Sequence, residues 1–261
     1  MKFGCCCKRE HIPLLAAVGF DYAELSAYEL ANLSDREFAQ VQEDLKRCKI
    51  PCVAVNDYAD SVPAMVGEGF DPQSTREYAR IVCRRAYEVG ARCIGIGAPN
   101  ARVLETRYSY FRAFEQAVQY VRIVCEEASA YEGLTIAMEA LNLRSCNFCN
   151  TQHQALAIVQ AAGKDNLKLE TDFYHMFMMA EDFASVRELA PVIAHMHISE
   201  KDPGDTRCYP EESDHTIFRA AGEALRAAKI DGNISVEAPL STLSEEKLAL
   251  SLRLMRQYLL H

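Results

Sequence analysis

The chain has 261 residues, of which 49 % are hydrophobic and 25 % charged, and its formal net charge is −9. This length suits one large α/β barrel or two small domains, and the composition is that of an ordinary globular protein. The negative charge argues against a nucleic acid or an anionic membrane as partner, because binding to phosphate groups needs clustered Lys and Arg.

The sequence carries no sign of a membrane or secretory segment. No stretch approaches the roughly 20 apolar residues of a membrane span. The run over residues 1–7 gives way at once to polar Lys8, so it is too short for a signal peptide, and a cytoplasmic location is expected. The 11 cysteines do not indicate disulfides, because many of them stand in apolar runs as small hydrophobes.

Short apolar runs alternate with longer amphipathic stretches along the chain. Runs rich in Val, Ile, Cys, Ala or Met predict strands buried on both faces, as in a parallel sheet covered by helices. The predicted strands are Phe3–Cys7, Tyr22–Ser26, Cys52–Asn56, Cys93–Gly97, Leu134–Ala140, Leu167–Thr171, Ile193–Ile198 and Asn233–Glu237.

Helical patterns with recognisable ends fill the intervals between these strands. Ser34 and Glu37 form a capping box before an amphipathic run that ends at Cys48. Asp71 is a cap residue, and Pro72 follows it at the first helical position. Further helical patterns are Thr75–Val89, Phe111–Tyr131, a run from Thr151 to Gly163, and Leu243–Leu260.

Eight strands, each followed by a helix, are what a closed barrel requires, whereas an open doubly wound sheet normally has about five to seven strands. The glycine cluster Gly95-Ile96-Gly97 lacks the third glycine and the helix start of a dinucleotide site. The sequence therefore predicts an α/β protein of one domain, a (β/α)8 TIM barrel over residues 1–261.

In such a barrel the functional side chains stand at the carboxyl ends of the strands. Four candidates follow one another there at intervals of about one βα unit: Glu139, Asp172, His197 and Glu237. One polar residue at a strand end is often merely bonded to the backbone, but four ionisable residues at successive ends are hard to ascribe to chance. Three carboxylates without a cation would repel each other, and three oxygens with one nitrogen suit Mn²⁺, Mg²⁺, Co²⁺ or Zn²⁺. The sequence therefore predicts one divalent metal held by these four residues.

The segments around these residues resemble the xylose isomerase-like superfamily of sugar isomerases and epimerases. This superfamily includes tagatose and psicose 3-epimerases, hydroxypyruvate isomerase and inosose-processing enzymes. The matching segments are Met138–Asn142, Asp172–Met176, His195–Ile198 and Ser235–Pro239, and Gly19–Leu25 is similar to the family's second strand. The resemblance spans essentially the whole chain, and its motifs are specific for the superfamily rather than for one substrate.

The resemblance implies a role for each matching residue. The metal ligands of the family correspond to Glu139, Asp172, His197 and Glu237. Glu139 and Glu237 also match the pair that moves a proton on opposite faces of a bound ketose. His175 matches a residue that hydrogen-bonds a substrate oxygen, and Arg207 resembles an arginine that contacts the substrate or the ligand glutamate.

The chemistry of such a site agrees with this resemblance. Removing a proton next to a carbonyl builds an enediolate, whose charge a divalent metal neutralises as a Lewis acid. One carboxylate accepts the proton and a second returns it. We therefore expect a metal-dependent isomerase or epimerase acting on a sugar, ketose or cyclitol-like α-hydroxy carbonyl, without a redox cofactor. Ketose 3-epimerases of this type carry a further Glu where this chain has Ser145, so the substrate stays open.

Three alternatives and the state of assembly also stay open. A lyase or dehydratase would use the same residues to expel a β-hydroxyl from the enediolate. A DNA-repair nuclease of the endonuclease IV type would need histidines at the ends of the third and fourth strands and an Asp-x-His in the loop after the seventh. Those places read Val55-Asn56-Asp57, Gly97-Ala98-Pro99 and Asp214-His215-Thr216. A barrel that only binds a ligand would not need both Glu139 and Glu237. Barrels of this kind are often dimers or tetramers, so we expect a homo-oligomer with a small carbohydrate-like substrate.

Other polar residues and thiols are expected to be structural. Glu24 and His195 stand inside predicted strands, where a buried and hydrogen-bonded state is the first expectation. Cys146 and Cys149 have a zinc-like spacing but no second pair, so a loop over the site is expected instead. The Cys5–Cys7 run is expected to pack in the core, with a place at the pocket as the alternative for one of its thiols.

Overall fold

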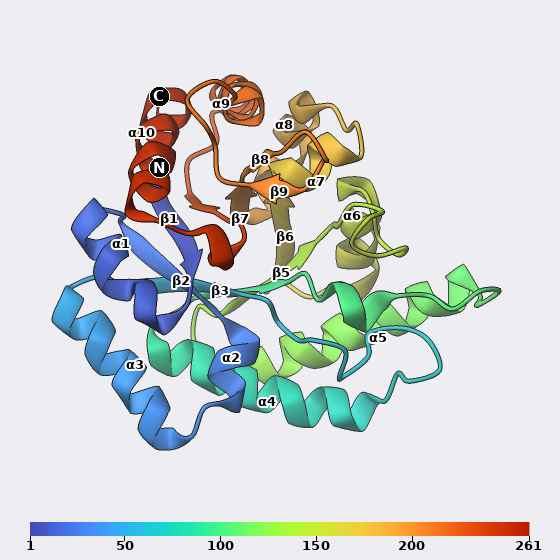
Figure 1. Cartoon of the computed structure of the whole chain (residues 1–261). Helices are drawn as coiled ribbons and strands as arrows, with labels where there is room; N and C mark the ends of the chain where they lie inside the picture. The colour runs from blue at the N-terminus through green and yellow to red at the C-terminus, as the bar shows by residue number, and fades with distance from the viewer. Residues whose placement is uncertain (261) are drawn as a thin grey trace.

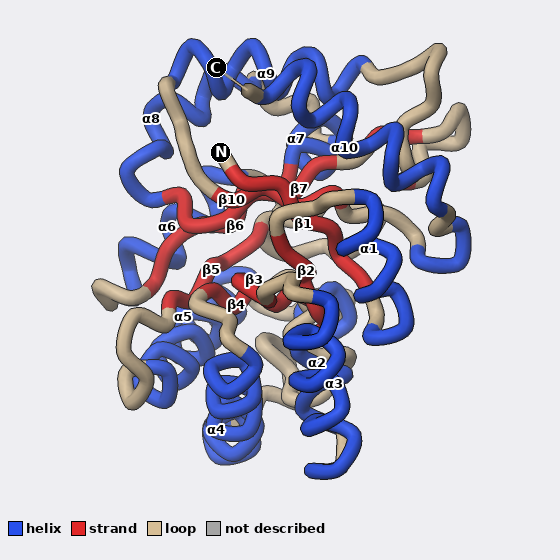
Figure 2. Tube along the Cα trace, turned by 90° about the vertical axis from the view of Figure 1, so that its left-hand side faces the viewer, coloured by secondary structure: helices blue, strands red, loops and turns tan. Residues whose placement is uncertain are grey.

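The computed structural model describes residues 1–260. Its strands close into a parallel barrel in the order β1-β10-β7-β6-β5-β4-β3-β2. The barrel strands are β1 (Lys2–Cys7), β2 (Tyr22–Ser26), β3 (Cys52–Asn56), β4 (Cys93–Ile96), β5 (Thr135–Glu139), β6 (Leu167–Asp172), β7 (Ile193–Ile198) and β10 (Asn233–Val236). The helices surround this barrel in Figure 1, and Figure 2 shows the strands at the centre of the molecule.

Each barrel strand is followed by at least one helix. The helices are α1 (Ile12–Val18), α2 (Ala27–Asn32), α3 (Asp35–Cys48), α4 (Pro72–Val89), α5 (Tyr110–Ala128), α6 (Gln152–Ala162), α7 (Phe173–Met178), α8 (Val186–Leu189), α9 (Thr216–Ala228) and α10 (Glu245–Leu259). Short 3-10 helices span Arg9–His11, Pro99–Arg102, Phe183–Ser185, Ala190–Val192 and Leu240–Thr242. Across residues 1–260, no helix combines the length and the apolar character needed to cross a membrane.

The predicted (β/α)8 barrel is confirmed, and each predicted barrel strand ends within one residue of its observed bounds. The predicted capping box is also present, since Ser34 accepts the N–H of Glu37 and Glu37 accepts the N–H of Ser34. A small antiparallel pair, β8 (Glu200–Lys201) with β9 (Arg207–Cys208), lies between β7 and α9, outside the predicted strands. Strands of two residues are too short to show a period in the sequence.

The two faces of the barrel sheet differ in chemistry. Alternate residues of a strand point to opposite faces. Residues facing the helices, such as Val55, Ile94 and Ile136, belong to the main apolar core. A small separate cluster of Ala54, Cys93 and Ala137 packs apart from that core. The remaining axial positions are largely polar, unlike the branched aliphatic layers that usually fill such barrels. This polar column leads up to the carboxyl ends of the strands.

Candidate metal and proton-transfer site

The four residues predicted as metal ligands lie together at the carboxyl end of the barrel. Glu139 ends β5, Asp172 ends β6, His197 lies near the end of β7 and Glu237 follows β10. These four strands are successive neighbours in the barrel, and the pairing of β6 with β7 sets Asp172 beside His197. One oxygen or nitrogen atom from each residue lies within 4.8 Å of the others. The order of the strands therefore creates the cluster.

The imidazole of His197 lies among the three carboxylates. Its Nδ1 is 3.2 Å from Glu237 Oε2, 3.8 Å from Glu139 Oε1 and 3.9 Å from Asp172 Oδ2. His197 Nδ1 and Glu139 Oε1 are both buried and have no hydrogen-bond partner among the described residues. Buried polar atoms are nearly always partnered, so two unpartnered atoms at one meeting point indicate a ligand. Three carboxylate oxygens and one imidazole nitrogen fit a divalent cation.

Arg207 lies against two of these residues. It stands on the β8–β9 pair, and its guanidinium donates to Asp172 Oδ2 at 2.7 Å and to the Glu237 carboxylate. The guanidinium also lies 4.6 Å from the centre of the Tyr174 ring, a cation–π geometry. Burial lowers the pKa of Arg207, but Asp172 and Glu237 hold that pKa above its ordinary value. Arg207 thus supplies a fixed positive charge beside two of the predicted ligands.

His175 is placed by the first turn of α7. Asp172 caps this helix by accepting the N–H of His175 at 2.9 Å, which explains the Asp-x-x-His spacing physically. His175 Nδ1 accepts the backbone N–H of Asn142 at 3.1 Å, and its Nε2 lies 2.9 Å from Nη2 of Arg207. Burial lowers the pKa of His175 to about 3, so its imidazole is neutral near pH 7.

The two glutamates predicted to move the proton have opposite electrostatic surroundings. Burial, together with the charges of Glu237 and Asp172, raises the pKa of Glu139. Burial also acts to raise the pKa of Glu237, but Arg207 and His197 lower it well below its ordinary value. Asn56 Nδ2 further donates to Glu237 Oε1 at 3.1 Å. Two neighbouring carboxyl groups whose pKa values are pushed apart suit an acid and a base.

A pocket of about 470 Å³ opens over these side chains. This volume lies within the range of small-molecule sites. The predicted residues that line it are Glu139, His175, Arg207 and Glu237. Asp172 and His197 are only 0 % and 1 % exposed. The two predicted proton-transfer groups and the two predicted substrate contacts thus face the pocket, and the other two ligands lie beneath it.

Two glycines of β4 and its end make room for acidic side chains. A Cβ at Gly97 would collide with the carboxylate of Glu139, and a Cβ at Gly95 would collide with the carboxylate of Glu170. The Gly95-Ile96-Gly97 cluster is not a dinucleotide motif. Its glycines instead leave room inside the barrel for the carboxyl groups of Glu139 and Glu170. Nothing in the local sequence pattern reveals the partners of these glycines, because they come from other strands.

The structure adds contacts that the sequence did not predict. Asn56 at the end of β3 holds Glu237, Tyr174 lies under Arg207, and Asn142 holds His175. The sequence places these three residues at or just after the ends of strands, where functional side chains of a barrel stand. It does not indicate which residues they contact, because those contacts form only when the barrel closes. Cys6 and Cys7 also line the pocket, and Cys6 Sγ lies 3.8 Å from His197 Nε2.

Three further residues discussed from the sequence follow β5. Ser145 lines the pocket. Cys146 and Cys149 are buried free thiols, and the candidate metal clusters found in residues 1–260 do not include them.

The comparisons with known proteins agree on one family. The sequence profile of the family described as "Xylose isomerase-like TIM barrel" matches residues 12–258. A D-psicose 3-epimerase from Agrobacterium fabrum is 23 % identical over 255 residues, which cover 92 % of this chain and 81 % of that protein. An L-ribulose 3-epimerase from Mesorhizobium japonicum is 31 % identical over 127 residues, 48 % of this chain and 41 % of that protein.

Solved structures give the same result for the fold. A crystal structure of a D-psicose 3-epimerase in the presence of D-fructose superposes with a TM-score of 0.85, at 18 % identity and over 99 % of both chains. The prediction of an enzyme of the sugar isomerase and epimerase class is confirmed by these relatives. The chain belongs to the xylose isomerase-like TIM barrel family.

Proposed function

We propose that this chain is an isomerase or epimerase for a sugar, a ketose or a cyclitol-like α-hydroxy carbonyl. Its metal, one divalent ion, would be held by the predicted ligands Glu139, Asp172, His197 and Glu237. The observation that supports this best is the convergence of these four side chains at the carboxyl end of the barrel, with Glu139 and Glu237 in the wall of a small-molecule pocket. Relatives named as ketose epimerases agree with this substrate class.

The two glutamates carry the proton transfer in this proposal. When bound, the metal would polarise the carbonyl and hydroxyl oxygens of the substrate as a Lewis acid. Glu139 and Glu237 approach His197 Nδ1 from β5 and from the end of β10, so their carboxylates face a bound substrate from two sides. One carboxylate takes the proton from the carbon beside the carbonyl, and the C–H electron pair remains in the enediolate. A proton returned by the other carboxylate forms the new bond, and the product keeps the formula of the substrate.

Arg207 and His175 prepare the site for this transfer. The Arg207 guanidinium holds Glu237 in its ionised form through a direct ion pair. His175 is neutral near pH 7 and lines the pocket, so its ring can exchange hydrogen bonds with a substrate oxygen. Asn142 donates to Nδ1 of His175, so Nε2 is the nitrogen that carries the hydrogen in the neutral ring and can donate to a substrate oxygen.

We also propose the remaining properties that the sequence suggests. The whole chain would act as one domain in the cytoplasm, and it would form a dimer or tetramer of identical chains. Mn²⁺, Mg²⁺, Co²⁺ and Zn²⁺ all suit the donor set. Light scattering on the purified protein tests the assembly, and reconstitution with each metal in turn tests the ion.

Turnover in heavy water tests the reaction class. The metal-loaded protein is incubated in D₂O with a panel of ketoses, hydroxypyruvate and inososes, and the products are followed by NMR and mass spectrometry. We expect a product of unchanged formula that carries deuterium at the carbon beside the carbonyl. Loss of water from the substrate would instead identify a lyase and contradict the proposal.

Two isosteric variants test the proton-transfer pair. Glu139→Gln and Glu237→Gln keep the shape of each side chain but cannot accept a proton, so each should lower turnover by about 10²- to 10⁴-fold. Metal content is measured on the same samples, which separates lost metal from lost proton transfer. Glu188→Gln, on the exposed surface of α8, is the matched control and should match the wild type. Full turnover by Glu139→Gln would show that this carboxylate does not move the proton.

A further inference from the structure

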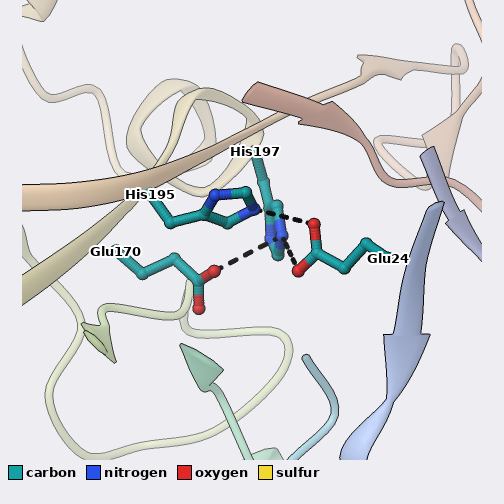
Figure 3. Close-up of side chains that lie close together, drawn as sticks. All are labelled: Glu24, Glu170, His195 and His197. Carbon is teal, nitrogen blue, oxygen red and sulfur yellow. Dashed lines mark hydrogen bonds and ion pairs between the residues drawn. The ribbon is translucent and has the colours of Figure 1, made fainter. Parts of the chain in front are cut away.

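A second polar cluster lies directly below the predicted metal ligands, inside the barrel. It consists of Glu24 from β2, Glu170 from β6, and His195 and His197 from β7 (Figure 3). All four side chains are at most 1 % exposed. His197 belongs to both clusters, because its Nδ1 faces the carboxylates above and its Nε2 faces the carboxylates below.

Glu24 is bonded to both histidines. Its Oε1 lies 3.0 Å from His197 Nε2, and its Oε2 lies 2.7 Å from His195 Nε2. The hydroxyl of Ser235 also donates to Oε2. An ionised carboxylate only accepts hydrogen bonds, so the Nε2 atoms of both histidines must carry the hydrogen.

The protonation of His197 Nε2 decides what the opposite nitrogen can do. A neutral imidazole carries one hydrogen, so a hydrogen on Nε2 leaves a lone pair on Nδ1. Nδ1 is the atom that faces Glu139, Asp172 and Glu237. Histidines that bind metals generally donate their other ring N–H to a carboxylate or carbonyl, which fixes the tautomer and the ring orientation.

We propose that Glu24 is a positioning residue for the metal site: it holds His197 in the tautomer and orientation in which Nδ1 serves as a ligand. This inference rests on the proposed metal site. Glu24 acts from across the barrel, since β2 and β7 are separated by β1 and β10 in the strand order. The contact joins residues 173 positions apart. Glu24 contacts none of the other three predicted ligands in the hydrogen bonds and ion pairs of the described residues.

Glu170 provides a matched comparison in the same cavity. Its Oε1 is 3.4 Å from the same Nε2 of His197, yet neither of its carboxylate oxygens has a hydrogen-bond partner in the described part of the chain. The single N–H of Nε2 is directed to the nearer acceptor, Glu24. The Glu170 carboxylate instead occupies the space left by Gly95. Replacing this carboxyl group by an amide should therefore leave the tautomer of His197 unchanged.

Two isosteric variants separate the two carboxylates. In the wild type, each oxygen of Glu24 accepts a hydrogen bond from one histidine Nε2. Glu24→Gln replaces one of these oxygens by an NH₂ group, which can only donate, so one of the two Nε2 atoms loses its acceptor. We expect this variant to bind Mn²⁺ about 10- to 100-fold more weakly than the wild type, as for other partners of metal-binding histidines. Glu170→Gln should keep the wild-type affinity. Isothermal titration with Mn²⁺ measures both, and thermal melting shows that the proteins are folded.

The tautomer itself is measured on the protein loaded with diamagnetic Zn²⁺, because in the metal-free chain Glu170 and Glu24 raise the pKa of His197 well above its ordinary value despite its burial. In ¹⁵N-histidine-labelled wild type, Nε2 of His197 should carry a hydrogen and Nδ1 should be bound to the metal, with the signal assigned by its loss in His197→Gln. This readout uses the wild type alone, so it decides the inference even where Glu24→Gln fails to fold. Partial return of Mn²⁺ affinity in Glu24→Asp, relative to Glu24→Gln, would further support positioning by a carboxylate.

Three outcomes would overturn parts of the account, and they are distinguishable. Metal bound through Nε2 of His197 instead of Nδ1, or wild-type Mn²⁺ affinity in Glu24→Gln, overturns the positioning role alone. Two Mn²⁺ ions per wild-type chain, with one lost in Glu170→Gln, would show that the lower cluster is a second cation site instead. Failure of the wild type to bind any divalent metal would overturn the proposed function together with the inference that rests on it, whereas the first two outcomes leave the proposed function standing.

Discussion

Individual residues determine which acidic side chains can enter the axis of this barrel. Gly97 leaves space for Glu139, and Gly95 leaves space for Glu170. Gly95 and Gly97 are two positions apart and lie on the same face of the chain. Of the two carboxylates beside them, that of Glu139 lines the pocket, and that of Glu170 does not. Their substitution therefore separates crowding inside the barrel from disturbance of the predicted site.

Gly97→Ala should displace the carboxylate of Glu139, because an added Cβ would collide with it. Misplacement of a reacting group by about 1 Å can cost about 100-fold in rate, and we expect a loss of turnover of that order. Gly95→Ala is the control, since it should displace only Glu170 and leave turnover close to that of the wild type. Steady-state rates and thermal melting of both variants provide the check. Equal losses of turnover would indicate that crowding alone explains the effect.

The residues of the site could be predicted individually, but their contacts could not. Glu139, Asp172, His197 and Glu237 stand at the ends of apolar runs, which is a signal within each segment. The contact of Glu24 with His195 and His197 spans the barrel interior and has no local signature.

At the scale of elements, the segment between β7 and α9 differs most from its prediction. It folds into the β8–β9 pair, which brings Arg207 over Asp172 and Glu237. Barrel strands were predicted closely because their runs are apolar and long enough to recognise. Such a short pair, by contrast, depends on contacts with the rest of the molecule rather than on a period in its own sequence.

The same segment caps α9 with a buried acid. Glu200 accepts the N–H of Phe218 at 3.0 Å in the first turn of α9, where the residue before the helix, His215, makes no side-chain cap. Burial raises the pKa of Glu200 to about 7, although its bond to Phe218 acts to lower it. The folded chain therefore holds this proton more tightly than the unfolded chain, in which a Glu titrates near about 4.3.

This shift predicts a pH dependence of stability. The contribution of Glu200 should be fully present below about pH 4.3 and should fall as pH rises through about 7, because ionisation is disfavoured only in the folded state. Glu200→Gln removes the titration but keeps an oxygen for the Phe218 N–H. Urea unfolding between pH 4.5 and 8 should show a smaller decline for this variant than for the wild type. An unchanged decline would exclude Glu200 as its source, and Glu188→Gln serves as the exposed control.

At the scale of the whole molecule, a polar column runs along the barrel axis. Glu24, Glu170 and His195 occupy its buried part, and the predicted metal ligands stand above them at the carboxyl ends of the strands. The number and order of strands followed from the alternation of runs in the sequence. The polar filling of the barrel could not be predicted in the same way. The face of each strand that turns inward is set only when the barrel closes.

The central claim is that four residues converging from neighbouring strands hold one divalent metal, and the metal content of Asp172→Asn tests it most directly. An asparagine can still cap α7, so the fold should be kept while one anionic ligand is removed. Asp182→Asn, which alters a cap outside the site, is the matched control. After reconstitution and removal of free ion, elemental analysis should find one metal per chain in the wild type and in Asp182→Asn, and substantially less in Asp172→Asn. An unchanged metal content in Asp172→Asn, or no metal in the wild type, would contradict the account.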